Sequence, residues 1–100
     1  MLRVGGRRIP LDEITYLEIS GQKTVIHTKE EWIEYAIPLS KLKEGFQQEG
    51  FCLSHFSYLV NLRHVARVER DTLTLDTGES IPVSRRYYPD LMARYVESLK

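Results

Sequence analysis

Short runs of β-forming residues, each ended by turn-forming residues, are the feature that most constrains this chain. Residues 14–20 and 23–28 are rich in β-branched and aromatic side chains, and Gly21 and Gln22 separate them. This arrangement predicts a β-hairpin with its tip at residues 20–23. Similar runs occupy residues 7–10, 32–37, 51–62, 65–69, 72–76 and 80–83. The pattern therefore predicts a mainly β domain built from hairpins.

Two segments depart from this β pattern. Residues 39–49 place apolar side chains at spacings of three and four, which predicts a short amphipathic helix that ends before Gly50. Residues 88–100 carry apolar side chains on one helical face and predict a second short helix, with Pro89 in its first turn. The expected fold class is thus mainly β with two short helices.

Length and composition bound the organisation of the chain. One hundred residues, 42% of them hydrophobic and 28% charged, are typical of one globular domain spanning residues 1–100. We leave open that residues 1–8 are a linker or remnant of a larger regulator. Fourteen basic and fourteen acidic residues give a formal net charge of zero, so bulk charge does not point to nucleic acid.

Targeting signals are missing from this sequence. No stretch approaches the roughly 18 consecutive apolar residues of a spanning helix, and the first residues lack a signal-peptide core. A single cysteine, Cys52, fits a reducing compartment and is expected to be a small buried residue. We therefore expect a soluble, cytoplasmic protein with no membrane partner.

Catalytic and metal-binding patterns are also weak. Ser54, His55 and Ser57 could suggest a nucleophile with a base, but neighbours on a strand alternate faces, and neither a glycine elbow nor an orienting acid accompanies them. The three histidines and the cysteine lack metal-ligand spacing. We expect no enzyme activity, metal or cofactor.

The aromatic residues do not suggest a platform for single-stranded nucleic acid. Trp32, Tyr35, Phe46 and Tyr58 fall in separate elements without regular spacing. We interpret them as core or partly buried side chains.

Three segments, in order, resemble the LytTR DNA-binding domain of bacterial transcriptional regulators. Residues 9–18 (IPLDEITYLE) are similar to the opening strand of the family. Residues 50–61 (GFCLSHFSYLVN) resemble its Gly-Phe followed by His-x-Ser-x-x-Val-Asn, and residues 78–87 (GESIPVSRRY) resemble its Gly-x-x-Ile-Pro-Val-Ser-Arg-Arg-Tyr ending. The similarity extends over residues 9–99, nearly the whole chain.

The resemblance implies an elongated, antiparallel, multi-sheet β fold that inserts loops, rather than a recognition helix, into successive DNA major grooves. It further implies a transcriptional regulator, either the output domain of a two-component response regulator or a stand-alone regulator. The implied partners are double-stranded DNA with paired direct repeats, a second copy of the domain on that DNA, and a receiver domain in the full-length protein.

The family's DNA-contacting positions fall on three loops of this sequence. Carried over, they are Gln22, Lys23, His55, Phe56, Ser57, Arg85 and Arg86. Arginine can pair bidentately with a guanine edge, histidine and glutamine can hydrogen-bond bases or phosphates, and lysine supplies a counter-charge for phosphate. Asn61, in contrast, is interpreted as a structural residue, a turn-former that bonds its own backbone.

One position departs from the family pattern, since Phe56 stands where arginine is common. An exposed phenylalanine would touch a thymine methyl or stack on a sugar, whereas a buried one would change the contact chemistry of the loop. The alternative function is a protein-interaction module on the same fold that has lost DNA binding.

Zero net charge does not decide between DNA binding and protein interaction. We expect Glu30, Glu31 and Glu34 at the far end of the first hairpin, and this placement would give a dipolar surface.

Overall fold

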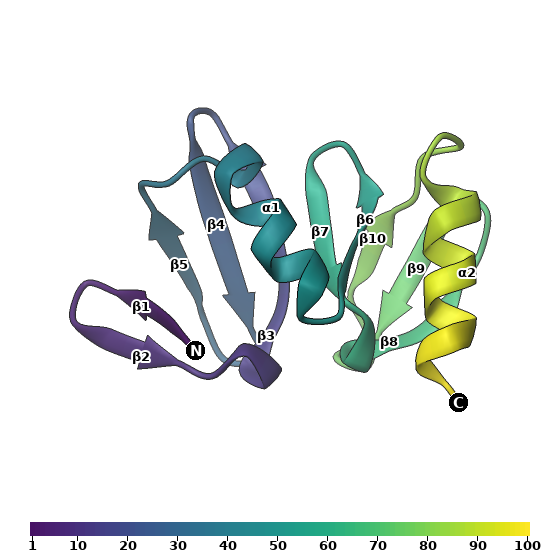
Figure 1. Cartoon of the computed structure of the whole chain (residues 1–100), viewed down its shortest axis with the longest axis horizontal. Helices are drawn as coiled ribbons and strands as arrows, with labels where there is room; N and C mark the ends of the chain where they lie inside the picture. Colours follow the sequence, from purple (N-terminus) through teal and green to yellow (C-terminus); the bar gives the residue numbers. More distant parts are fainter.

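Ten strands form three antiparallel sheets in the computed structural model, which describes residues 1–100 (Figure 1). The largest sheet has the strand order β5-β4-β3-β7-β6, a second has the order β10-β9-β8, and β1 pairs with β2 alone. The strands are β1 (Leu2–Val4), β2 (Arg7–Ile9), β3 (Ile14–Ser20), β4 (Lys23–Thr28), β5 (Trp32–Tyr35), β6 (Phe51–His55), β7 (Tyr58–Asn61), β8 (Val65–Val68), β9 (Thr72–Leu75) and β10 (Ser80–Pro82).

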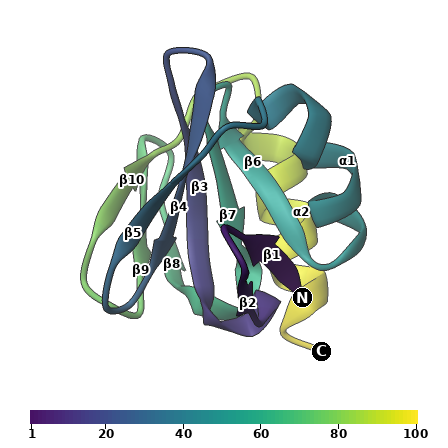
Figure 2. The same cartoon turned by 90° about the vertical axis from the view of Figure 1, so that its left-hand side faces the viewer.

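Two α-helices and two single turns of 3-10 helix complete the fold. Helix α1 (Leu39–Gln48) and helix α2 (Tyr88–Ser98) lie on the same side of the molecule, as Figure 2 shows. The 3-10 turns, η1 (Leu11–Glu13) and η2 (Leu62–His64), lead into β3 and β8. Neither α-helix has the length and apolar character needed to cross a membrane.

The strands β3, β7 and β6 of the five-stranded sheet bury side chains on both faces. Consecutive residues on a strand point to opposite faces, and β3, β7 and β6 each supply residues to both sides. Leu17, Leu59 and Phe51 pack in a core with α1 and the β1–β2 hairpin. Tyr16, Val60 and Cys52 pack in a second core with the three-stranded sheet and α2. The middle strands therefore join the two halves of a molecule measuring 36 × 25 × 24 Å.

Most sequence-based elements are confirmed, and the fold is mainly β with two short helices as expected. Residues 1–8, which were left open as a linker, contribute β1 and most of β2, and Val4 lies in the first core. The strand expected at 32–37 ends at Tyr35, and the run expected at 51–62 is divided into β6 and β7 by a turn.

The placement of one aromatic residue was wrong. Trp32, expected in or near the core, is 64% exposed on the edge strand β5. Phe46 is buried, and Tyr35 and Tyr58 are partly buried, as expected.

Candidate nucleic-acid interface

Antiparallel connections divide the turns of this molecule between two opposite ends. At one end, the imidazole Nδ1 of His64 lies 2.9 Å from an Asp76 carboxylate oxygen, and the Lys29 ammonium lies 3.7 Å from the same atom. Nε2 of His64 donates to the carbonyl oxygen of Asp12 at 2.5 Å. These contacts gather η1, η2 and the β4–β5 and β9–β10 turns at this end, which we call the acidic end. Its acidic residues are Asp12, Glu13, Glu30, Glu31, Asp76 and Glu79.

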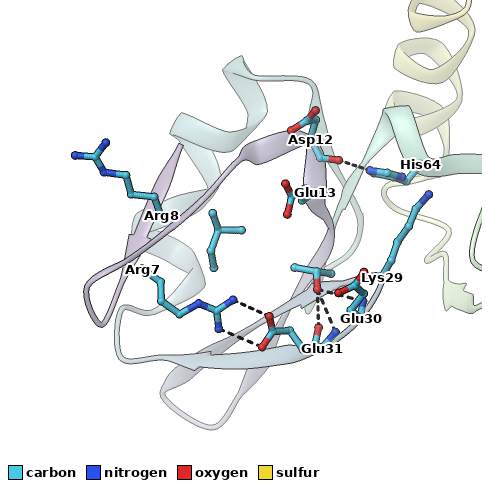
Figure 3. Close-up of a pocket in the computed structure, with 10 residues that line it drawn as sticks. Arg7, Arg8, Asp12, Glu13, Lys29, Glu30, Glu31 and His64 are labelled. Atoms are coloured by element: carbon cyan, nitrogen blue, oxygen red, sulfur yellow. Dashed lines mark hydrogen bonds and ion pairs between the residues drawn. The ribbon is translucent and has the colours of Figure 1, made fainter.

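A charged pocket of about 290 Å³ opens at the acidic end (Figure 3). Within it, the Arg7 guanidinium donates to both carboxylate oxygens of Glu31, at 3.1 and 2.7 Å. This bidentate hydrogen bond lowers the pKa of the Glu31 carboxyl. Arginine and carboxylate charges thus already neutralise each other in the pocket.

The three motif loops lie at the opposite end, which we call the loop edge. It comprises the β3–β4 tip (residues 20–23), the β6–β7 turn (residues 55–58) and the β10–α2 loop (residues 83–87), which follow one another along the upper edge of Figure 1. The Ile19 amide donates to the carbonyl of Ser57 at 3.0 Å, and the Ser84 amide donates to the carbonyl of Ser54 at 2.8 Å. Backbone hydrogen bonds therefore tie the outer loops to the strands of the middle loop.

The first loop presents an exposed amide and an exposed cation. Gly21 has φ +63°, the left-handed conformation that allows the tight reversal of the chain. Gln22 and Lys23 are exposed beyond it, and the Lys23 ammonium lies 3.3 Å from a Glu34 carboxylate oxygen. The expectation for Glu34 was wrong, because pairing of β5 with β4 places it near the loop edge rather than at the far end.

The middle loop fixes the tautomer of His55. Its Nδ1 accepts a hydrogen bond from the Ser57 amide at 3.0 Å, so the neutral ring carries its proton on Nε2. The ring also lies edge-on to Tyr58, with 5.7 Å between ring centroids. The Nε2–H of His55 is not used within the protein and can donate to a ligand.

Phe56, the next residue, is exposed rather than buried. Its exposed fraction is 68%. The sequence left open whether Phe56 is exposed or buried, and the structure shows that it is exposed. The ring lines a surface depression of about 220 Å³ together with Lys43 of α1 and Arg86 of the third loop. An apolar side chain and two cations are therefore neighbours on the loop edge.

The third loop carries two arginines, and neither forms an ion pair with a carboxylate. The Arg86 guanidinium lies 5.5 Å from the centroid of the Tyr87 ring. Arg85 lines a second depression with Arg70 and Asp71. Both guanidinium groups can therefore bind phosphate or a base edge without first breaking an ion pair.

Two cations at this edge were missed by the motif comparison. Arg70 lies in the β8–β9 turn, 5.8 Å from the centroid of the Tyr88 ring, and Lys43 lies on α1. The alternation of turns between the two ends could have indicated Arg70, because its turn falls at the same end as the other loops. Nothing in the sequence pattern distinguishes Lys43 from the other surface lysines.

The fold and the loop edge together define a class, the mainly β domains whose connecting loops converge on one exposed edge. A family profile described as "LytTr DNA-binding domain" matches residues 6–95. The chain belongs to this family and is a DNA-binding domain.

A solved structure supports the same assignment. It is the LytTr DNA-binding domain of a putative methyl-accepting/DNA response regulator from Bacillus cereus, which is 25% identical to this chain, with a TM-score of 0.78. The match covers 86% of this chain and 84% of that structure. No curated protein matches the chain.

Proposed function

We propose that this domain binds specific sites in double-stranded DNA through the loop edge and regulates transcription. The observation that carries the proposal is the convergence of the three motif loops on one edge, with four cationic side chains beside them. These cations are Lys23, Arg70, Arg85 and Arg86. Most of the turn carboxylates lie at the acidic end, so a chain of zero net charge still offers DNA a positive face.

The size of the molecule fits one helical repeat of DNA. Its longest dimension is 36 Å, and one turn of B-DNA spans about 34 Å. The outer loops are separated along this dimension (Figure 1), so they enter successive major grooves on one face of the duplex. The first loop, with Gln22 at its tip, enters one groove, and Arg85 enters the next.

Individual side chains then divide between reading bases and positioning the protein. The Arg85 guanidinium suits a bidentate hydrogen bond to guanine O6 and N7. Arg86, Lys23 and the Nε2–H of His55 supply phosphate contacts that fix register. Ser57 holds the middle loop through its backbone and offers its hydroxyl as a further donor.

The proposed function also includes a second copy of the domain on the DNA and a receiver domain in the full-length protein, because a single domain is expected to bind weakly. Two copies on paired direct repeats would combine moderate affinities into stable occupancy. The B. cereus neighbour is described as part of a response regulator, and we infer that this domain likewise follows a receiver domain in a cytoplasmic regulator. Residues 1–100 then form its DNA-binding unit, with the β1–β2 hairpin as part of the fold.

Two arginine variants of equal charge test the proposal. Arg85→Ala removes a guanidinium from the loop edge, whereas Arg8→Ala removes an exposed, unpaired one from the β1–β2 hairpin. We expect Arg85→Ala to weaken binding to a selected operator by about 1 to 3 kcal/mol and to relax specificity at one position. Arg8→Ala should bind as the unchanged protein does.

Thermal unfolding of both variants controls for folding, and the midpoints should stay unchanged. If Arg85→Ala and Arg8→Ala weaken operator binding equally, the loss of affinity is an effect of net charge and not of a contact at the loop edge. Unchanged affinity of Arg85→Ala would contradict its assignment as a DNA contact.

A further inference from the structure

The middle loop presents an apolar side chain where a DNA-binding surface normally presents polar ones. No large hydrophobic side chain of this protein is more exposed than Phe56, at 68%. The buried cores already account for the other phenylalanines, since Phe46 and Phe51 lie in the first core. Packing within the domain therefore does not explain Phe56.

The backbone that carries Phe56 is held on both sides. The Ser57 amide donates to His55 Nδ1 at 3.0 Å, and the Ser57 carbonyl accepts from Ile19 at 3.0 Å. Strands β6 and β7 are paired on either side of the turn, where a register shift between Leu53 and His55 sets His55 opposite Tyr58. The ring therefore projects from a fixed platform, which favours a contact with one defined surface.

The order of the loops determines which DNA groove this platform faces. The middle loop lies between the outer two along the longest dimension (Figure 1). On one face of B-DNA, a minor groove lies between successive major grooves. If the outer loops occupy two major grooves, as in the proposed function on which this inference rests, the middle loop faces the minor groove between them.

The floor of the minor groove differs among base pairs mainly at one atom. Every pair presents acceptors there, and a G·C pair adds the N2 amino group of guanine as a donor. A phenyl ring over that amino group would displace its water and offer no acceptor. A polar group buried without a partner is unfavourable. An apolar ring therefore discriminates against guanine without forming a hydrogen bond to any base.

We propose that Phe56 selects A·T pairs in the central minor groove by excluding the N2 amino group of guanine. Lys43 and Arg86 support this placement, because they line the same depression as the ring and are available to the phosphates that border the groove. The thymine methyl group plays no part in the selection, since it lies in the major groove.

Base analogues at the centre of the site separate these contacts. An operator selected from a random pool would be made with A·T, G·C, inosine·C or A·uracil at the pairs between the two outer contacts. Inosine keeps the major-groove edge of guanine and lacks the N2 amino group, whereas uracil differs from thymine only by the missing methyl. Affinity for each duplex would be measured by fluorescence anisotropy.

We expect equal binding to the A·T, A·uracil and inosine·C duplexes and about tenfold weaker binding to G·C, a typical effect of one unfavourable pair. Phe56→Ala should bind all four alike and keep its thermal midpoint, because the ring is exposed. Lys23→Ala is the matched control, and it should bind more weakly throughout while keeping the tenfold discrimination.

Three results would overturn the inference. If Phe56→Ala still binds the G·C duplex more weakly than the other three, another residue or the shape of the DNA causes the discrimination. If the unchanged protein binds the A·uracil duplex more weakly than the A·T duplex, Phe56 contacts a thymine methyl group in a major groove. Equal binding of the unchanged protein to all four duplexes, with selectivity over scrambled DNA retained, overturns the role of Phe56 and leaves the proposed function standing. Loss of all selectivity overturns both.

Discussion

At the scale of single residues, the motif resembling the LytTr family contains both buried structural positions and exposed loop positions. Asn61 belongs to the structural group, as expected. It is fully buried, its side-chain amide donates to the carbonyls of Leu11 and Ile14 at 3.3 and 2.9 Å, and its oxygen accepts from the Arg63 amide at 3.1 Å. One side chain thus holds η1, the start of β3 and η2 together.

Asn61→Ala should destabilise the domain by about 2 to 4 kcal/mol, because it leaves buried backbone groups without partners. Urea unfolding followed by circular dichroism would measure the loss. Operator affinity of the folded fraction should stay unchanged. A stability within experimental error of the unchanged protein would contradict the structural role.

Cys52 provides a second prediction at this scale. Its side chain is buried, and burial, with the Asp90 carboxylate 3.8 Å from the sulfur, raises the pKa of the thiol to about 12. The reactive thiolate is therefore scarce in the folded protein at pH 8. We expect iodoacetamide to label the native protein far more slowly than the urea-unfolded protein, as followed by mass spectrometry, and equal rates would contradict burial.

At the scale of elements, local patterns predicted most of the fold. The β3–β4 hairpin follows from its β-forming runs and Gly21, and α2 begins with Pro89 in its first turn. Strand β1 was missed because three residues carry too little periodicity. Trp32 was misplaced because edge position depends on sheet order, which composition does not encode.

The candidate site was predictable only in part for the same reason. Motif similarity selected the three loops, but it could not show the pairing of Lys23 with Glu34 or the contribution of Arg70 and Lys43. These features depend on strand register and on which turns share an end.

The β1–β2 hairpin should contribute to folding rather than to DNA contact. Ile9 is 3% exposed in the first core, so Ile9→Ala should lower the free energy of unfolding by about 2 to 5 kcal/mol. Chemical denaturation would measure this change. A change below 1 kcal/mol, roughly a surface effect, would show that the hairpin is loosely attached.

At the scale of the whole molecule, charge separation and pairing explain how a neutral domain could occupy DNA. The acidic end holds a bidentate Arg7–Glu31 pair, and the loop edge holds the unpaired Arg85 and Arg86. In the proposed function, this separation is what turns the loops of the domain toward the duplex.

Pairing on direct repeats predicts a dependence on helical phase. Inserting about 5 base pairs between the repeats rotates one site by half a turn, and about 10 restore the phase. We expect the first insertion to abolish cooperative binding in a gel-shift titration and the second to retain most of it. Identical effects of the two insertions would mean that the copies bind independently.

The most direct test of the central claim is an anisotropy titration of this domain on a selected direct-repeat duplex and on a scrambled duplex, each at two salt concentrations. If three or four cations of the loop edge contact phosphates, the logarithm of affinity should fall with the logarithm of salt with a slope of about −3. We expect this slope together with tighter binding to the selected duplex. Equal binding to both duplexes at both salt concentrations would contradict it and favour a protein-interaction module.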